Sequence, residues 1–315
     1  MKPKEERFSS KKLSWRNWFI YIVLVGLVIF FSLINKNFAT ISNFSVIGRQ
    51  TAMVSVIGFG MTFVITAAQI DLSVGSIVGL VGMTSTLALQ WGWGLLGASL
   101  IGILTGTLIG LVNGVITAKA KIPAFLVTLG MLGIARGISL TLTGTRTVVV
   151  YDKSFPALWG AGNIVGIPVS VVWVAVFFVI SILLYDYTVF GNYVKATGGN
   201  LKAAIYSGIN TDGMIIRVLT LSGTFSAIAG LLMAARLSAG RPEVGSGMEL
   251  DAIAAVILGG TSLFGGKGSI INTLIGALIM GVISNGLVIL GIGSSIQMIV
   301  KGAIIIAAVS LSEKN

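Results

Sequence analysis

Residues 94–113 read GLLGASLIGILTGTLIGLVN, an uncharged run of 20 residues. This is about the length that a helix needs to cross the hydrocarbon core of a bilayer. Glycine recurs in it every four positions, at Gly102, Gly106 and Gly110, and the series continues at Gly114. On a helix this spacing lines the glycines along one face, where a second backbone can approach closely. The stretch therefore predicts a transmembrane helix in a tightly packed bundle.

The rest of the chain has the same apolar character. Hydrophobic residues make up 55% of the 315 residues and charged residues only 10%, whereas a soluble domain carries roughly 25% charged residues. We predict an all-α polytopic membrane protein of about ten transmembrane helices, some of them short or broken. The predicted segments are 18–34, 51–70, 72–90, 94–113, 124–143, 165–185, 214–235, 250–264, 270–289 and 295–311.

Two of these segments need comment. Segment 250–264 is short for a span, which predicts a re-entrant segment or a broken helix buried in protein. Segment 18–34 follows a basic stretch, as in a signal peptide, but its apolar run is too long for one and no small-residue cleavage site follows. We expect an uncleaved first span. The predicted divisions are a cytoplasmic tail (1–17), a transmembrane domain (18–311) with a cytoplasmic loop at about 187–213, and a cytoplasmic C-terminus (312–315).

Lysine and arginine favour one side of the predicted membrane. With the N-terminus inside, the inner segments hold about twice as many of these residues as the outer segments, as the positive-inside rule requires. Both termini are therefore predicted to be cytoplasmic. The same bias explains the net charge of +11, which in a soluble protein would suggest nucleic acid. No basic stretch interleaves with aromatic residues, so we expect no nucleic-acid partner.

Several kinds of chemistry are excluded by composition. The chain has no cysteine and no histidine, so it lacks thiol nucleophiles and histidine acid–base catalysis. Segment 258–269 resembles a phosphate-binding loop, but Thr261 stands where the first glycine is needed, and Gly268 follows Lys267 where serine or threonine is needed. We expect no catalytic residue, no cofactor and no metal site in this chain.

Polar side chains inside the predicted spans are the candidate functional residues. Asp71 is costly at membrane depth: it either lines a polar path or carries a proton, or it caps the start of segment 72–90. Arg136 and Lys301 are intramembrane cations that could pair with Asp71 or line a cavity, and Lys301 could also extend to the interface. The predicted substrate pathway comprises Thr62, Gln69, Asp71, Ser73, Ser76, Asn113 and Arg136.

The largest inner loop contains a predicted short helix. Asn200 suits its N-cap and Gly208 its C-terminal cap, with helix-forming residues between them. Elsewhere, residues 64–77 resemble residues 257–270, since both place a Gly-Ser turn between two apolar runs on the inner side. Internal repeats are common in transporters, although one match of this length does not define a topology.

The inner loop also carries a family resemblance. Ala203-Ala204 followed by Gly208 is similar to the coupling-loop motif of ATP-binding-cassette import permeases, in which a short cytoplasmic helix docks into a groove on the ATPase subunit. Lys202 stands where that motif usually has glutamate, which leaves the ATPase contacts open. The resemblance implies that coupling to an ATPase involves Asn200, Lys202, Ala203, Ala204 and Gly208.

The resemblance extends over most of the chain, to the ribose-type sugar permease family. It rests on GMTFVIT (60–66) with IDLSVGS (70–76), IPAFLVTLGM (122–131), the 198–208 loop, and AVILGG (255–260) with GGKGS (265–269). Ala67-Ala68-Gln69 departs from the glycine-rich stretch expected there. The resemblance implies the non-catalytic permease subunit of an ATP-driven importer for ribose or a similar monosaccharide, with ATP hydrolysed by a partner.

The same resemblance implies the partner proteins and the membrane in which the protein lies. These are a second copy of the chain in a homodimer, a cytoplasmic ATP-binding subunit, an extracytoplasmic sugar-binding protein, and the lipid of the bacterial plasma (inner) membrane. Three alternatives remain: a permease for branched-chain amino acids or nucleosides, an ion-coupled secondary transporter that uses Asp71 as its carrier, and a structural scaffold. The polar residues within spans argue against the scaffold.

Overall fold

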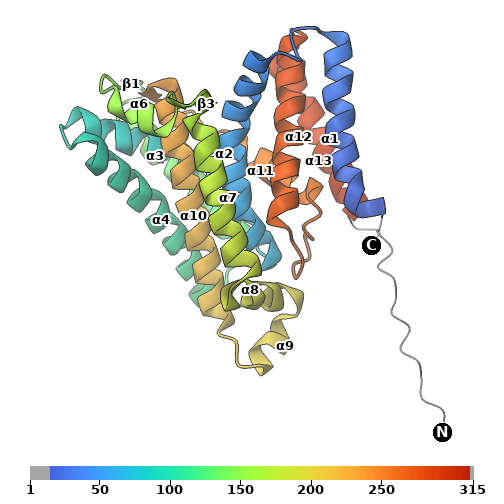
Figure 1. The fold of residues 1–315 in the computed structure, drawn as a ribbon. Coiled ribbons are helices and arrows are strands. Elements are labelled where there is room, and N and C mark those ends of the chain that lie inside the picture. The colour runs from blue at the N-terminus through green and yellow to red at the C-terminus, as the bar shows by residue number, and fades with distance from the viewer. Residues whose placement is uncertain (1–14, 313–315) are drawn as a thin grey trace.

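The computed structural model describes residues 15–312, which form a bundle of helices with short strands at one end (Figure 1). The helices are α1 (Trp15–Ile34), α2 (Ile41–Thr66), α3 (Val74–Gln90), α4 (Gly94–Ala120), α5 (Ala124–Thr141), α6 (Ser154–Trp159), α7 (Val169–Asp186), α8 (Val189–Gly199), α9 (Leu201–Tyr206), α10 (Thr211–Leu237), α11 (Met248–Leu258), α12 (Ile270–Ile289) and α13 (Ser294–Ser312). The strands are β1 (Val148–Val149), β2 (Asn163–Ile164), β3 (Ile167–Pro168) and β4 (Ala239–Gly240).

Every predicted membrane segment overlaps a helix, which confirms an all-α polytopic membrane protein. Helices α4, α5, α7, α10 and α12 are each long and apolar enough to cross a membrane, and shorter apolar helices occur in α1, α3 and α13. The predicted tail and C-terminus, 1–17 and 312–315, lie almost wholly outside the described residues.

Several predicted boundaries were wrong for local reasons. Helix α2 begins ten residues before the predicted segment 51–70, because Thr40 caps it by accepting a hydrogen bond from the Asn43 backbone N–H at 3.2 Å. It also ends earlier, since Ala68 takes a left-handed backbone with φ of 56°. The predicted near-fusion of the second and third spans is instead a non-helical stretch, residues 67–73.

Helix α11 is a half-length helix buried in protein. Its 11 residues span about 16 Å, roughly half of the hydrocarbon core. Ala252, Ala254, Ala255 and Val256 are fully buried. The predicted segment 250–264 overran it, because the helix stops at Gly259 and Gly260 then takes φ of 80°. The broken-helix interpretation of this segment is therefore the correct one.

The core of the bundle lies around α2, α3 and α10. Helix α10 packs against α2, α3 and α4, while α12 packs against α1, α2 and α11. The predicted glycine ridge of α4 faces α10. A side chain at Gly106 would meet the backbone carbonyl of Gly223 and the Cβ of Ala227, and one at Gly110 would meet the backbone carbonyl of Leu219. Helix α4 therefore approaches α10 at backbone contact distance along this face.

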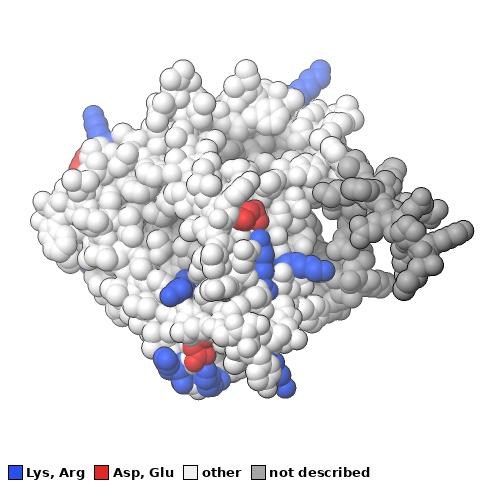
Figure 2. Space-filling view, turned by 60° about the horizontal axis from the view of Figure 1, so that its bottom comes forward, with Lys and Arg blue, Asp and Glu red and all other residues white. Residues whose placement is uncertain are grey.

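The bundle has two distinct ends, which we call the inner end and the outer end. The inner end carries α8 and α9, the start of α1 and the end of α13, and the outer end carries β1–β4 and α6 (Figure 1). The strands pair antiparallel, β1 with β4 and β2 with β3. Figure 2 brings the inner end toward the viewer, and basic side chains outnumber acidic ones there. This is the distribution that the positive-inside rule predicts for a cytoplasmic end.

Candidate functional site

Two short helices project from the inner end. Thr188 is the N-cap of helix α8, and its hydroxyl accepts a hydrogen bond from the Gly191 backbone N–H. Asn200 is the N-cap of helix α9, and its Oδ1 accepts one from the Ala203 backbone N–H at 3.0 Å. Gly208 follows α9 with φ of 81°, a conformation that favours glycine. The predicted short helix with these two caps is confirmed, and α8 is an addition that the sequence did not suggest.

Helix α9 presents apolar side chains to solvent outside the bundle. Only Ala204 of the helix is buried, and Lys202 and Ala203 are exposed. The exposed fractions are 49% for Leu201, 52% for Ile205 and 90% for Tyr206. We call Leu201, Ile205 and Tyr206 the α9 patch. Apolar groups clustered on a projecting helix are typical of a surface that another protein covers.

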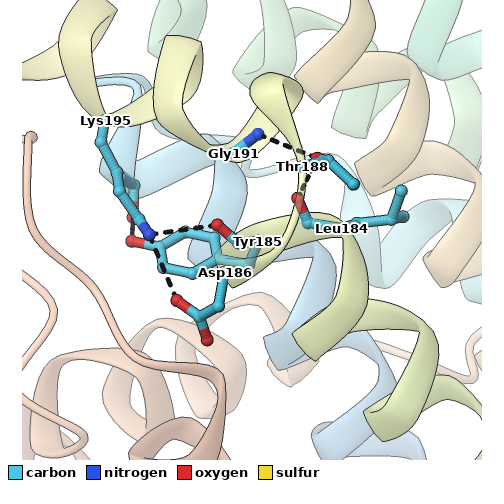
Figure 3. A network of polar contacts seen from close by, with 7 residues as sticks. Leu184, Tyr185, Asp186, Thr188, Gly191 and Lys195 are labelled. Carbon is cyan, nitrogen blue, oxygen red and sulfur yellow. Dashed lines mark hydrogen bonds and ion pairs between the residues drawn. The ribbon is translucent and has the colours of Figure 1, made fainter.

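A polar network fixes α8 to the end of α7 (Figure 3). Lys195 Nζ donates to the Tyr185 carbonyl oxygen at 3.1 Å and to Asp186 Oδ1 at 3.2 Å, and it lies 4.2 Å from the centre of the Tyr185 ring. The Thr188 hydroxyl donates to the Leu184 carbonyl at 2.6 Å. The Tyr185 hydroxyl also hydrogen-bonds the Thr66 hydroxyl at 3.0 Å. Helices α7, α8 and α2 therefore meet as one connected unit.

Paired glycines join α8 to the loop between α11 and α12, residues 259–269. The Gly266 backbone N–H donates to the Thr66 carbonyl at 2.8 Å. A side chain at Gly198 would overlap that same carbonyl, and one at Gly265 would lie 2.6 Å from the Gly198 carbonyl oxygen. The glycine-rich segment that resembled a phosphate loop thus packs against protein backbone. The two echoing segments, 64–77 and 257–270, contact each other here.

Asp71 lies at the centre of a buried hydrogen-bonded cluster. Its Oδ1 accepts from the Ser73 backbone N–H at 2.9 Å and the Ser73 hydroxyl at 2.6 Å, and its Oδ2 accepts from the Ser222 hydroxyl at 2.8 Å. Asn113 Nδ2 donates to the Ser73 hydroxyl at 2.9 Å, and the Ser76 hydroxyl donates to the Ser73 carbonyl. Ser73, not Asp71, occupies the N-cap of α3. The carboxylate links the start of α3 to α10, and Ser73 links the same point to α4.

We expect Asp71→Asn to fold and Asp71→Ala to be destabilised. The asparagine oxygen keeps both bonds from Ser73, and its amide can donate to Ser222. Alanine leaves two buried hydroxyls without their acceptor, which costs on the order of 2–3 kcal/mol. Thermal unfolding of the purified variants measures this difference. If Asp71→Asn unfolds like the parent but loses all transport, the negative charge itself is required and the carrier interpretation gains support.

The other predicted pathway residues lie apart from this cluster. The Thr62 hydroxyl hydrogen-bonds that of Thr273 at 2.8 Å, and Gln69 is partly buried in the inner turn. Arg136 Nη1 donates to the carbonyls of Pro242 and Val244 at 2.5 and 2.9 Å, so it holds the outer loop between β4 and α11. The cation does not pair with Asp71. The structure therefore brings together Asp71, Ser73, Ser76 and Asn113, but not Thr62, Gln69 or Arg136.

Lys301 lies in a different place and lines a cavity. Its Nζ is 2.7 Å from Asp251 Oδ2, so it pairs with α11 and not with Asp71. The cavity, which we call the outer cavity, has a volume of about 230 Å³. None of the seven predicted pathway residues lines it. The lining residues are Gln50, Thr51, Met53, Val54, Met233, Arg236, Met248, Asp251, Met280, Gly281, Ser284, Val288, Gln297 and Lys301.

Known proteins are similar in sequence to this chain over almost its whole length. Residues 43–309 match the family described as "Branched-chain amino acid transport system / permease component". The ribose import permease protein RbsC of Haemophilus influenzae is 41% identical over 92% of this chain and 90% of its own length. RbsC of Bacillus subtilis is 40% identical over 94% and 92%. The D-allose transport system permease protein AlsC of Escherichia coli is 39% identical over 95% and 92%.

No solved structure matches the chain. The family match alone covers well over half of the sequence, and the relatives align nearly end to end. The predicted resemblance is therefore confirmed: the chain belongs to the permease family of ATP-binding-cassette importers that includes the ribose import permeases.

Proposed function

We propose that the chain is the translocation subunit of an ATP-driven importer for ribose or a similar monosaccharide in the bacterial plasma membrane. The supporting relatives are about 40% identical and are described as ribose and D-allose permeases. The observation that carries the proposal is the α9 patch, because it presents apolar side chains at the inner end, on the segment that resembles the coupling motif. A cytoplasmic ATPase subunit covers this patch.

The contacts behind the patch suggest how movement of the ATPase reaches the membrane. Helix α9 follows α8 directly, with Asn200 between them. Helix α8 is tied to α7 through Lys195 and to α2 through the Gly198–Thr66 contact. The 259–269 loop adds α11 and α12 to the same junction. A displacement of α9 therefore reaches four membrane helices, α2, α7, α11 and α12, through these contacts. Asn200, Lys202, Ala203, Ala204 and Gly208 are the proposed coupling residues.

The proposal includes the partners of the complex. A second copy of the chain completes the pore as a homodimer, and an extracytoplasmic sugar-binding protein delivers the solute to the outer end. Lys202 is exposed on α9 beside the patch, so the ATPase surface that meets it carries a neutral or acidic group at that point.

Uptake by membrane vesicles tests the function. The vesicles contain the chain with the ATP-binding and solute-binding subunits of its own importer, and they are offered labelled ribose or labelled leucine. ATP-dependent accumulation of ribose alone is expected. Accumulation of leucine alone would instead support the amino-acid transport that the family description names. Uptake that needs a proton gradient and no ATPase subunit would support the secondary-transporter alternative.

A further inference from the structure

The outer cavity lies inside a single copy of the chain, in the outer half of the bundle. Its walls come from the first half of α2, the last turns of α10, the start of α11, the second half of α12 and the first half of α13. At about 230 Å³ it is smaller than the roughly 300–1,000 Å³ of pockets for drug-sized ligands. The cavity therefore suits a small solute.

The polar groups of the cavity are partly unsatisfied. Gln50 Oε1 is buried and has no hydrogen-bond partner among the described residues. Buried polar atoms in native proteins normally have a partner, so an exception inside a cavity indicates a missing one. Arg236 forms no ion pair within residues 15–312 and is only partly buried. The cavity thus offers both a free acceptor and free donors.

The charges in the cavity are otherwise compensated. Asp251 and Lys301 neutralise each other at 2.7 Å, with 15% and 26% of their side chains exposed. The Thr51 hydroxyl donates to the Ile47 carbonyl at 2.7 Å and can still accept, and the Ser284 hydroxyl can donate and accept. Met53, Met233, Met248 and Met280 form the apolar part of the wall, and methionine adapts to irregular shapes. Apart from the charged Arg236 guanidinium, the wall offers mixed donors and acceptors without net charge, which are complementary to a neutral polyhydroxylated molecule.

Below the cavity, toward the inner end, α12 packs closely against α2 and α11; we call the contact between α2 and α12 the α2–α12 seam. Gly281 packs against Thr51, and Gly276 packs against the Ala255 backbone. Further along α2, the Thr62 and Thr273 hydroxyls join α2 to α12, and Thr62 lies about 16 Å from Thr51 along the helix. Thr62 was a predicted pathway residue, and this position places it beneath the cavity.

We infer that the outer cavity binds a monosaccharide, with Gln50 accepting from a sugar hydroxyl and Arg236 donating to another. Bound solute then lies on the outer side of the α2–α12 seam, where the two helices are in contact. This inference rests on the proposed function, because the substrate class follows from it, but the binding site is a separate claim about this chain alone.

The chain has no cysteine, so a single introduced cysteine gives labelling without background. The test uses Ser284→Cys in the purified full-length chain in detergent and measures its rate of reaction with a charged thiol reagent. Ribose is expected to slow the rate about tenfold at a concentration near ten times its Kd, since the free fraction falls as 1/(1 + [L]/Kd). Ser246→Cys, an exposed position in the outer loop, is the matched control and should not respond.

A second substitution connects the protection to the buried acceptor. Gln50→Leu in the Ser284→Cys chain keeps the volume and removes Oε1, which should raise the ribose concentration needed for half protection about threefold to tenfold. If Ser284→Cys cannot be purified, Gln297→Cys on α13 replaces it. Protection by leucine and not by ribose would overturn the sugar assignment.

Protection by neither solute would overturn the binding site. The uptake assay with the ATPase and solute-binding subunits separates the two claims. ATP-dependent ribose uptake by the Ser284→Cys chain without ribose protection means that the cavity inference is wrong while the proposed function stands. Ribose protection without ribose uptake means the reverse.

Discussion

Replacing Tyr206 by Glu is expected to abolish ATP-driven uptake without unfolding the protein. Tyr206 is 90% exposed at the end of α9 and contributes little to the fold. In the proposed complex its ring is covered by the ATPase subunit, and a carboxylate there loses its water without a partner. Loss of a central aromatic residue costs about 2 kcal/mol or more in an interface, which is more than a tenfold loss of affinity. Co-purification of the ATPase subunit with the tagged chain measures the effect directly.

Tyr151→Glu provides the control. Tyr151 is 85% exposed, but it follows β1 at the outer end, on the opposite side of the proposed membrane. The same substitution at the same exposure should leave ATPase co-purification unchanged. Equal loss of the ATPase subunit from both variants would mean that the effect comes from altered expression or folding, and retention by both would remove α9 from the docking surface.

The membrane segments could be predicted because each depends on the length of one continuous run of apolar residues. Helix α12 has the predicted bounds, and the predicted ridge at Gly102–Gly114 faces another helix. The start of α2 was missed because polar residues lie inside the helix. Helix α2 carries Asn43, Arg49 and Gln50 in its first half, and a hydropathy criterion rejects such residues although Asn43 and Arg49 find hydrogen-bond partners elsewhere in the bundle.

The same difference separates the candidate sites, because some depend on adjacent residues and others on residues from several helices. The cap residues Asn200 and Gly208 were predictable, because capping depends on a few adjacent residues. The outer cavity was not, because its walls come from five helices, α2 and α10 to α13, and only Lys301 among its residues was recognised as an intramembrane charge. Asp251 was the signal that could have revealed it, since a second intramembrane acid, in the first turn of α11, needs a cation. The packing of the glycine-rich 259–269 loop was not predictable either, since its partner, Gly198, is distant in sequence.

The junction at Gly198 leads to the second large expected effect. Gly198→Ala places a Cβ onto the Thr66 carbonyl oxygen and within 2.9 Å of the Ala67 carbonyl carbon. Both neighbours are backbone atoms, which cannot rotate away as a side chain would, so α8 must move from the end of α2. Overpacking of this kind typically costs about 1–3 kcal/mol. We expect lower thermal stability and the loss of solute-stimulated ATP hydrolysis in the assembled complex.

Gly199→Ala is the matched change one residue away. Its Cβ would meet only the Gly266 Cα, at the ordinary contact distance of 3.6 Å, and alanine favours a helix over glycine by about 1 kcal/mol. This variant should therefore be as stable as the parent or slightly more so, with coupling intact. The two substitutions make the same chemical change at the end of the same helix, so general effects of added bulk apply to both. If both variants hydrolyse ATP in response to solute as the parent does, the Gly198 contact does not transmit the movement of α9. If only Gly198→Ala loses the response while its ATPase subunit still co-purifies, the loss lies between docking and the membrane helices, at the junction where Thr66, Gly198 and the 259–269 loop meet.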